Sequence, residues 1–229
     1  MWLTRARRER ARRRYARHPF PDPTLQRLLA SPWPDTNALW DEVDWLAIDL
    51  ETTGLDPKTG YIISFGWVAV DRGRIRLDTA RHLLIDSRNL VGDSATIHHI
   101  RDTDRSEGVD LPSALRMLAR AMTDRLPVMH HAPLDTGFLR AAYREQFGMD
   151  WFQPTADTLV LEKKRLFQRE QTMPGNVLRL NRCRERYGLP ETNAHNALED
   201  ALACGELFMA WARHFGGDGP RVKDCLSRV

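Results

Sequence analysis

The first half of the chain alternates between apolar runs and short polar breaks, which is typical of strands. A short, mostly apolar run at residues 45–50 ends in acids and predicts a buried strand. Two longer apolar runs, at residues 61–70 and 75–85, flank the tetrapeptide Asp71-Arg-Gly-Arg74, which predicts two strands joined by a tight turn. The pattern therefore predicts a three-stranded antiparallel meander.

From residue 111 onward, apolar residues recur at the three- and four-residue spacing of helices. Helices are predicted over residues 111–122, 134–142, 177–187 and 197–211, and brief strands at 127–130 and 158–161. Antiparallel strands followed by an alternation of strands and helices indicate an α/β fold, in which helices flank a mixed sheet.

The composition is that of an ordinary globular protein. With 229 residues, 42% of them apolar and 28% charged, the chain fits one domain with extensions and not a disordered, fibrous or multi-span membrane protein. The longest apolar run, residues 61–70, is too short to cross a bilayer. Three cysteines without a CxxC pair support neither a disulfide framework nor a zinc ribbon, so a reducing cytoplasm is predicted.

The net charge of +3 hides a basic N-terminal arm. Residues 1–20 hold eight arginines and one acid, which gives +7 and leaves −4 for the rest of the chain. Such an arm suits a polyanion such as nucleic acid, but a solvated tail explains it equally well. Five prolines in residues 18–34 predict an extended wrapping segment. We therefore divide the chain into an arm with this wrapping segment (1–38), a central domain (39–215) and a short tail (216–229).

Two acids at the end of the first predicted strand are candidate metal ligands. Asp49 and Glu51 are two residues apart, and side chains alternate along a strand, so both carboxylates should lie on the same face. A divalent cation would relieve their repulsion, and Mg²⁺ or Mn²⁺ fits oxygen ligands better than Zn²⁺ does. The alternative is that both acids simply face solvent at a strand end.

Two further acids favour the metal site. Asp135 lies early in the predicted helix at 134–142, and Asp200 lies within the most apolar helix of the chain. Burying an isolated carboxylate is very costly, so an acid in such a helix needs a partner or a metal ion. Helix capping could explain Asp135, but it does not easily explain Asp200.

These acids lie in three motifs that together resemble the DEDDh, or DnaQ-like, 3'-5' exonucleases, a family that includes the proofreading epsilon subunit of bacterial DNA polymerase III. The motifs are Asp49-Leu-Glu-Thr-Thr-Gly-Leu55, His131-Ala-Pro-Leu-Asp135 and His195-Asn-Ala-Leu-Glu-Asp200. Their order and separations are similar to those of the family over about residues 45–211. One departure is His131, where many relatives carry asparagine.

The resemblance implies an RNase H-like fold with a mixed five-stranded sheet, in which three antiparallel strands precede parallel ones. It also implies a phosphodiesterase with two metal ions, Mg²⁺ or Mn²⁺, held by Asp49, Glu51, Asp135 and Asp200. In the family, the position of Asp49 bridges both ions, Glu51 and Asp200 complete the first site, and Asp135 serves the second. His195 would be the general base that takes a proton from the attacking water.

The spacing between His195 and Asp200 constrains where the histidine lies. Five residues on an ideal helix rotate a side chain by roughly 140°, so both groups could not face one site from within the same helix. His195 should therefore precede the helix. A related class of exonucleases uses a tyrosine four residues before the aspartate, and Asn196 at that position excludes it.

The resemblance also implies substrate contacts and an activity. Family members contact the terminal nucleotide through the positions of Thr52, Thr53, Gly54 and Leu55, and His131 is a further candidate contact. The expected activity is release of nucleoside 5'-monophosphates from single-stranded 3' ends, on DNA in the first instance. RNA trimming and a catalytically idle nucleic-acid-binding or polymerase-accessory module are the alternatives. Whether the protein forms a homodimer or binds a polymerase or repair partner stays open.

Overall fold

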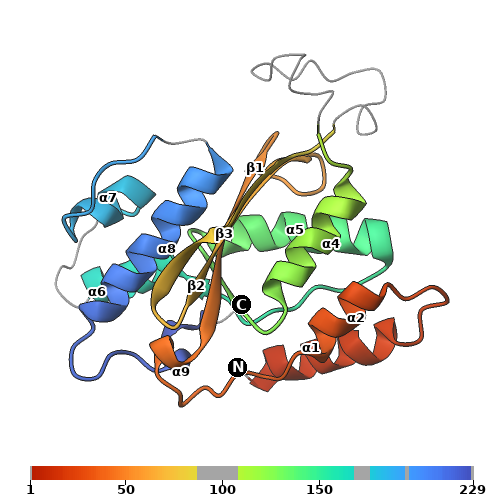
Figure 1. Ribbon diagram of the computed structural model, residues 1–229, viewed down its shortest axis with the longest axis horizontal. Helices are drawn as coiled ribbons and strands as arrows, with labels where there is room; N and C mark the ends of the chain where they lie inside the picture. Colours follow the sequence, from red (N-terminus) through yellow and green to blue (C-terminus); the bar gives the residue numbers. More distant parts are fainter. Residues whose placement is uncertain (1, 87–107, 168–175, 194–195, 228–229) are drawn as a thin grey trace.

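The computed structural model describes residues 2–86, 108–167, 176–193 and 196–227. Within these residues, five strands form one mixed sheet in the order β3-β2-β1-β4-β5 (Figure 1). Antiparallel pairs join β1 to β2 and β2 to β3, and β4 runs parallel to both β1 and β5. The predicted sheet is thus confirmed. The strands are β1 (Asp44–Thr52), β2 (Ile62–Asp71), β3 (Arg74–Leu84), β4 (Leu126–Met129) and β5 (Ala156–Asp157).

The turn between β2 and β3 is the tight turn that the sequence predicts. Arg72 and Gly73 have φ values of 49° and 69°, both in the left-handed region, while Asp71 pairs with Arg74. Two consecutive residues with positive φ are what a type I′ hairpin turn requires, because its twist matches the twist of the strands.

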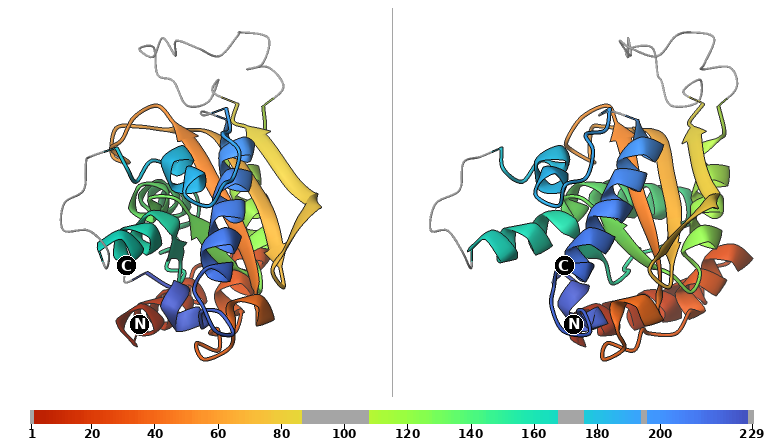
Figure 2. Two further views of the ribbon diagram at one scale, coloured as in Figure 1. Left: turned by 90° about the vertical axis from the view of Figure 1, so that its left-hand side faces the viewer. Right: turned by 60° about the vertical axis from the view of Figure 1, so that its left-hand side comes forward.

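Helices cover both faces of the sheet (Figure 2). One face packs on α2, α4 and α5 through a core that includes Leu46 and Ile48 of β1. The other face packs on α8, with Trp45 of β1 in the core between them. Alternation along β1 therefore decides which helix layer each side chain meets. The helices of these layers are α2 (Pro23–Ala30), α4 (Leu111–Met122), α5 (Ala132–Phe147), α6 (Thr158–Phe167), α7 (Leu180–Glu185) and α8 (Ala197–Arg213).

Two predicted elements near the C-terminal half differ from the structure. The strand expected at 158–161 is wrong, because β5 ends at Asp157 and Thr158 begins α6. The Asp157 carboxylate accepts hydrogen bonds from the amides of Leu159 and Val160, at 3.0 and 3.4 Å, and so begins a helix. The helix expected at 177–187 is only the six-residue α7.

The N-terminal segment is helical and packed. The extended conformation expected for residues 18–34 is wrong, because Asp22 caps the helix α2, which begins at Pro23. Leu25, Leu28 and Leu29 of α2 are buried in the core that also contains α4. Before it, the arm forms α1 (Trp2–Tyr15), and Arg8 of this helix donates a hydrogen bond to the carbonyl oxygen of Leu28 at 3.0 Å.

The C-terminal segment also packs on the domain. Val222 and Cys225 of the short helix α9 (Val222–Cys225) are buried, and Leu226 pairs with Ala156 of β5. The amide of Val222 donates to the carbonyl of Ala38 at 3.0 Å. The domain boundaries at 39 and 216 stay predictions, although the segments on both sides of each boundary are in contact.

No helix among the described residues is both long and apolar enough to cross a membrane. All three cysteines are buried and unpaired. A cytoplasmic location stays a prediction.

Candidate metal centre

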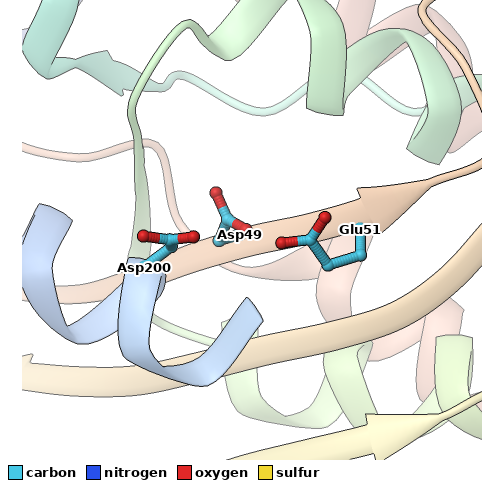
Figure 3. Close-up of side chains that lie close together, drawn as sticks. All are labelled: Asp49, Glu51 and Asp200. Carbon is cyan, nitrogen blue, oxygen red and sulfur yellow. The ribbon is translucent and has the colours of Figure 1, made fainter. Parts of the chain in front are cut away.

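Three of the four predicted acids converge at one end of the sheet. Carboxylate oxygens of Asp49, Glu51 and Asp200 all lie within 4.8 Å of one another (Figure 3). Asp49 and Glu51 lie on the face of β1 that meets α8, as their two-residue spacing predicts, and Asp200 lies in the first turn of α8. Three oxygen donors at this separation could hold a divalent cation.

Without a cation, the repulsion between these carboxylates and their burial both disfavour the ionised form of the cluster. Burial, followed in order by the charges of Asp135, Asp200 and Glu51, raises the pKa of Asp49 to about 9. A group in this state would hold a proton at neutral pH, since desolvation and like charges both disfavour its ionised form. A divalent ion would remove that cost, so the donor set fits a hard cation.

Asp135 borders the cluster from α5. Its side chain is buried, with 5% exposure, and burial raises its pKa to about 8. The charges of Asp157 and Glu51 act in the same direction, whereas main-chain hydrogen bonds, one of them from Leu50, oppose it. Asp135 lies outside the group of three acids whose carboxylate oxygens are within 4.8 Å of one another, but its negative charge raises the pKa of Asp49.

A glycine lets α8 approach the sheet closely enough to complete the cluster. Gly66 of β2 pairs directly with Asp49, and a Cβ atom at Gly66 would lie 2.0 Å from the backbone of Ala197 and 2.3 Å from the amide nitrogen of Leu198. No side chain fits in that space. Gly66 therefore sets the separation between β2 and the N-terminal turn that carries Asp200.

The loop after β1 is held by hydrogen bonds at its base. The Thr52 hydroxyl donates to the carbonyl of Gly54 at 2.7 Å, and Thr53 exchanges two hydrogen bonds with Tyr61, at 2.9 and 3.0 Å. Leu55 beyond them is 81% exposed, although it is apolar. The substrate roles of Thr52, Thr53, Gly54 and Leu55 stay predictions.

His195 lies outside the described residues. Helix α8 begins at Ala197, and Asn196 caps it by accepting hydrogen bonds from the amides of Leu198 and Glu199, at 3.0 and 3.2 Å. The histidine thus precedes the helix in the sequence, and its role as a base stays a prediction.

Comparison with known proteins places this cluster in a family. The exonuclease family model RNase_T matches residues 46–208, which contain all of these acids. The chain belongs to the DnaQ-like exonuclease family. It is 30% identical to the PolC-type DNA polymerase III of Thermotoga maritima over 173 residues, 76% of this chain, and 29% identical to the DNA polymerase III epsilon subunit of Treponema pallidum over 77% of this chain.

This exonuclease-family chain spans only 12% of the length of the PolC-type relative but 80% of the Treponema pallidum epsilon subunit. Solved structures share its fold. A zinc-bound complex of E. coli exonuclease I with single-stranded DNA has a TM-score of 0.60 and 15% identity, covering 75% of this chain and 41% of that one. The cell-death related nuclease 4 has a TM-score of 0.57 and 16% identity, covering 72% and 62%. The RNase H-like fold is thereby confirmed.

Two residues that support the site of this exonuclease-family chain, Asp157 and Gly66, were not identified from the sequence. Asp157 is buried and accepts hydrogen bonds from the amides of His131 and Ala132, both at 3.1 Å, in addition to its contacts in α6. It therefore fixes the start of α5, which carries Asp135, while His131 adopts a left-handed conformation with a φ of 73°.

The sequence did carry a signal for each of the two. Asp157 precedes a helix and has the residue type of an N-cap. The other missed residue is Gly66, a glycine inside an apolar strand, which often marks a close backbone approach.

Proposed function

We propose that this protein is a metal-dependent 3'-5' exonuclease that removes nucleoside 5'-monophosphates from single-stranded nucleic-acid ends. The observation that carries the proposal is the convergence of Asp49, Glu51 and Asp200 within 4.8 Å in a chain that belongs to an exonuclease family. The raised pKa values of Asp49 and Asp135 support it, because perturbed carboxylates cluster at functional sites.

In this proposal, four carboxylates hold two ions of Mg²⁺ or Mn²⁺. Asp49, Glu51 and Asp200 supply the first site, and Asp135 together with Asp49 supplies the second. Among its described residues the cluster offers only carboxylate oxygens, with no histidine or cysteine, and such oxygen ligands suit these hard cations. When bound, such ions activate a water molecule and stabilise the leaving oxygen of a phosphodiester.

The side chains around the carboxylates perform the remaining work. His195 accepts the proton of the attacking water, which requires a neutral ring. Thr52, Thr53, Gly54 and Leu55, together with His131, contact the terminal nucleotide, and the exposed Leu55 offers an apolar surface to its base. Asp157 is a positioning residue, because it holds the start of the helix that carries Asp135.

We propose single-stranded DNA as the substrate. The epsilon relative is named as a subunit of DNA polymerase III, and the E. coli exonuclease I neighbour is bound to single-stranded DNA. RNA trimming is the second candidate, because the family model that matches carries the name RNase_T. An idle binding module fits less well, since all four acids and His195 are present.

A digestion ladder tests this proposal. DNA and RNA oligonucleotides of one sequence, labelled at the 5' end and either blunt or with 3' overhangs, would be incubated with Mg²⁺, Mn²⁺ or EDTA. We expect stepwise shortening from the 3' end with either metal, faster on DNA, and nucleoside 5'-monophosphates as products by mass spectrometry. The Asp49→Asn variant is the control for a contaminating nuclease. Shortening in EDTA, or by Asp49→Asn at the wild-type rate, would contradict the proposal.

A polymerase or repair partner, a homodimer and a cytoplasmic location stay predictions. The polymerase partner draws support from the name of the Treponema pallidum relative.

A further inference from the structure

Three arginines form a stripe along one flank of α1. Arg7, Arg10 and Arg14 follow the spacing i, i+3 and i+7, which places them on the same side of the helix, and all three are exposed. A neighbouring side of the helix is buried, with Ala11 at 4% exposure and Tyr15 at 3%. Packing of that buried side fixes the direction in which the stripe faces.

The stripe continues onto α5, where it adds two arginines. Burial lowers the pKa of Arg140, and the neighbouring charges of Arg144 and Arg7 lower it further. Asp150 is the acid that both helices share: it pairs with Arg14 at 3.0 Å and with Arg144 at 2.7 Å. Positive charge is thus in excess on this α1–α5 arginine face, which we define as Arg7, Arg10, Arg14, Arg140 and Arg144.

The face also contains an aromatic ring. Phe152 is half-buried, lies under the Arg140 guanidinium at 5.0 Å, and lines a surface hollow together with Arg7, Arg10 and Arg14. Arginines with an interleaved aromatic side chain are typical of surfaces that bind single-stranded nucleic acid, because the arginines meet phosphates and the ring can stack on a base. A solvated helix face would need no such ring.

The part of this face on α1 is separated from the acids. Helix α1 lies at the opposite end of the molecule from the first turn of α8, which carries Asp200 (Figures 1 and 2). From Arg7 to Arg14 the stripe extends over roughly 10 Å, at about 1.5 Å per helical residue. That length corresponds to about three nucleotides of one strand, at a rise of about 3.4 Å per nucleotide along the axis of a duplex.

We propose that the α1–α5 arginine face is a second nucleic-acid contact, which holds the phosphate backbone of a long substrate away from the 3' end that is cleaved. The choice of substrate class rests on the proposed function. A strand held there contributes affinity through released counterions, so that its binding weakens as salt increases.

Two matched double variants test this inference. Arg7→Gln with Arg10→Gln removes two charges from the face, and Arg5→Gln with Arg12→Gln removes two exposed charges from the other flank of the same helix. Glutamine and arginine have similar helix propensities, so both variants should keep α1, which circular dichroism and thermal unfolding would verify. Each variant differs from the wild type by the same net charge.

The measurement is fluorescence anisotropy of a labelled 30-nucleotide DNA single strand in EDTA, over a range of salt concentrations. Each single-strand phosphate contact contributes about 0.7 to the log-log slope, so Arg7→Gln with Arg10→Gln should reduce the slope by about 1.4 and weaken binding on the order of tenfold at low salt. Arg5→Gln with Arg12→Gln should keep the slope of the wild type.

Equal slopes for the two double variants would overturn the inference. If both slopes also equalled that of the wild type, the arginines would not contact nucleic acid, and an acidic protein surface would be the alternative partner. Because binding is measured in EDTA, this result is separate from the proposed function, which is tested by whether the wild-type protein shortens a trinucleotide in Mg²⁺ or Mn²⁺ and not in EDTA.

Discussion

The two ends of the molecule both gather charges of one sign, but in different environments. At the end that carries Asp49, Glu51 and Asp200, these three acids are half-buried, and Asp135 beside them is buried. At the other end, the arginines of α1 other than Arg8 are exposed. Burial makes repulsion expensive, whereas exposed charges are screened by water and salt.

This difference predicts two kinds of binding. The acidic end should bind a small, highly charged ion tightly and with a defined geometry, since the ion relieves a cost already present in the fold. The basic end should bind a long polyanion loosely, with an affinity that depends on salt. The experiments below test the acidic end from the largest expected effect to the smallest, and the arginine variants described above test the other.

Removal of any one carboxylate should have the largest effect. Asp49→Ala, Glu51→Ala, Asp135→Ala and Asp200→Ala should each reduce cleavage to near background while the fold stays intact, because the ion loses a ligand but the remaining acids lose a repulsive neighbour. Cleavage rates at increasing metal concentration and circular dichroism would measure this.

Glu199→Ala is the matched control for the carboxylate series, because Glu199 is an exposed acid one residue from Asp200. It should cleave at close to the wild-type rate. Near-wild-type rates for any two of the four carboxylate variants at saturating metal would break the assignment of a two-metal site.

Substitution of His195 should affect proton removal and leave metal binding unchanged. His195→Ala should lower turnover by roughly 10² to 10⁴, the range expected for loss of a general base, and should bind metal as the wild type does. Wild-type turnover should rise as pH increases across the range in which histidines lose their proton, because only the neutral imidazole accepts a proton. His214→Ala, at the exposed histidine that forms the C-cap of α8, is the control. A flat profile from pH 5.5 to 8, with chemistry limiting, would exclude this role.

Gly66 should show that the acidic end depends on backbone packing. Gly66→Ala places a Cβ atom 2.0 Å from the backbone of Ala197, so α8 must move away from β2. We expect a loss of roughly 1 to 3 kcal/mol in unfolding free energy, as for other overpacked sites, and a weaker apparent metal affinity. Calorimetric metal titration and denaturant unfolding would measure the two effects.

Val222→Ala provides the comparison for Gly66→Ala. Val222 lies in the same core as α8 but belongs to α9 and contributes nothing to the acidic cluster. It should lower stability and keep metal affinity. Equal metal affinities for the two variants would show that the approach of α8 at Gly66 does not position Asp200.

The two ends also differ in how far the sequence predicts them. The acidic end follows from local rules: the two-residue spacing of Asp49 and Glu51 selects one face of a strand, and the three motifs select the elements that meet. The contacts between elements that are distant in the sequence could not be predicted from it. Gly66 against Ala197, and Asp157 against the start of α5, join residues far apart in the chain.

The basic end was harder to predict because its local signals conflict. Eight arginines in twenty residues favour a solvated tail, and five prolines favour an extended segment. The helices α1 and α2 form because Tyr15, Leu25 and Leu28 are buried against the domain, and tertiary packing of this kind outweighs local preference. The buried side of α1 consists of only a few residues, too few to register as a periodic pattern.

The last expected effect concerns pH and the stability of the metal-free protein. The pKa of Asp49 is about 9 in the folded state against a reference value of 3.8, so between these values the folded protein retains a proton that the unfolded chain has released. The unfolded state then binds fewer protons, and the free energy of unfolding falls as pH rises from about 4 to about 9. Asp135, with a pKa of about 8, acts in the same direction.

In EDTA, the melting temperature of the wild type should therefore fall between pH 5 and pH 9, and Asp49→Asn should flatten that decline because it removes the titrating group. Added Mg²⁺ should stabilise the wild type more than the variant, and more strongly at high pH, where the carboxylates are ionised. Arg7→Gln with Arg10→Gln should leave the decline unchanged, since those arginines are exposed and distant from the acids. A wild-type decline no steeper than that of Asp49→Asn would mean that burial of this carboxylate costs the fold little, and the contrast between the two ends would disappear.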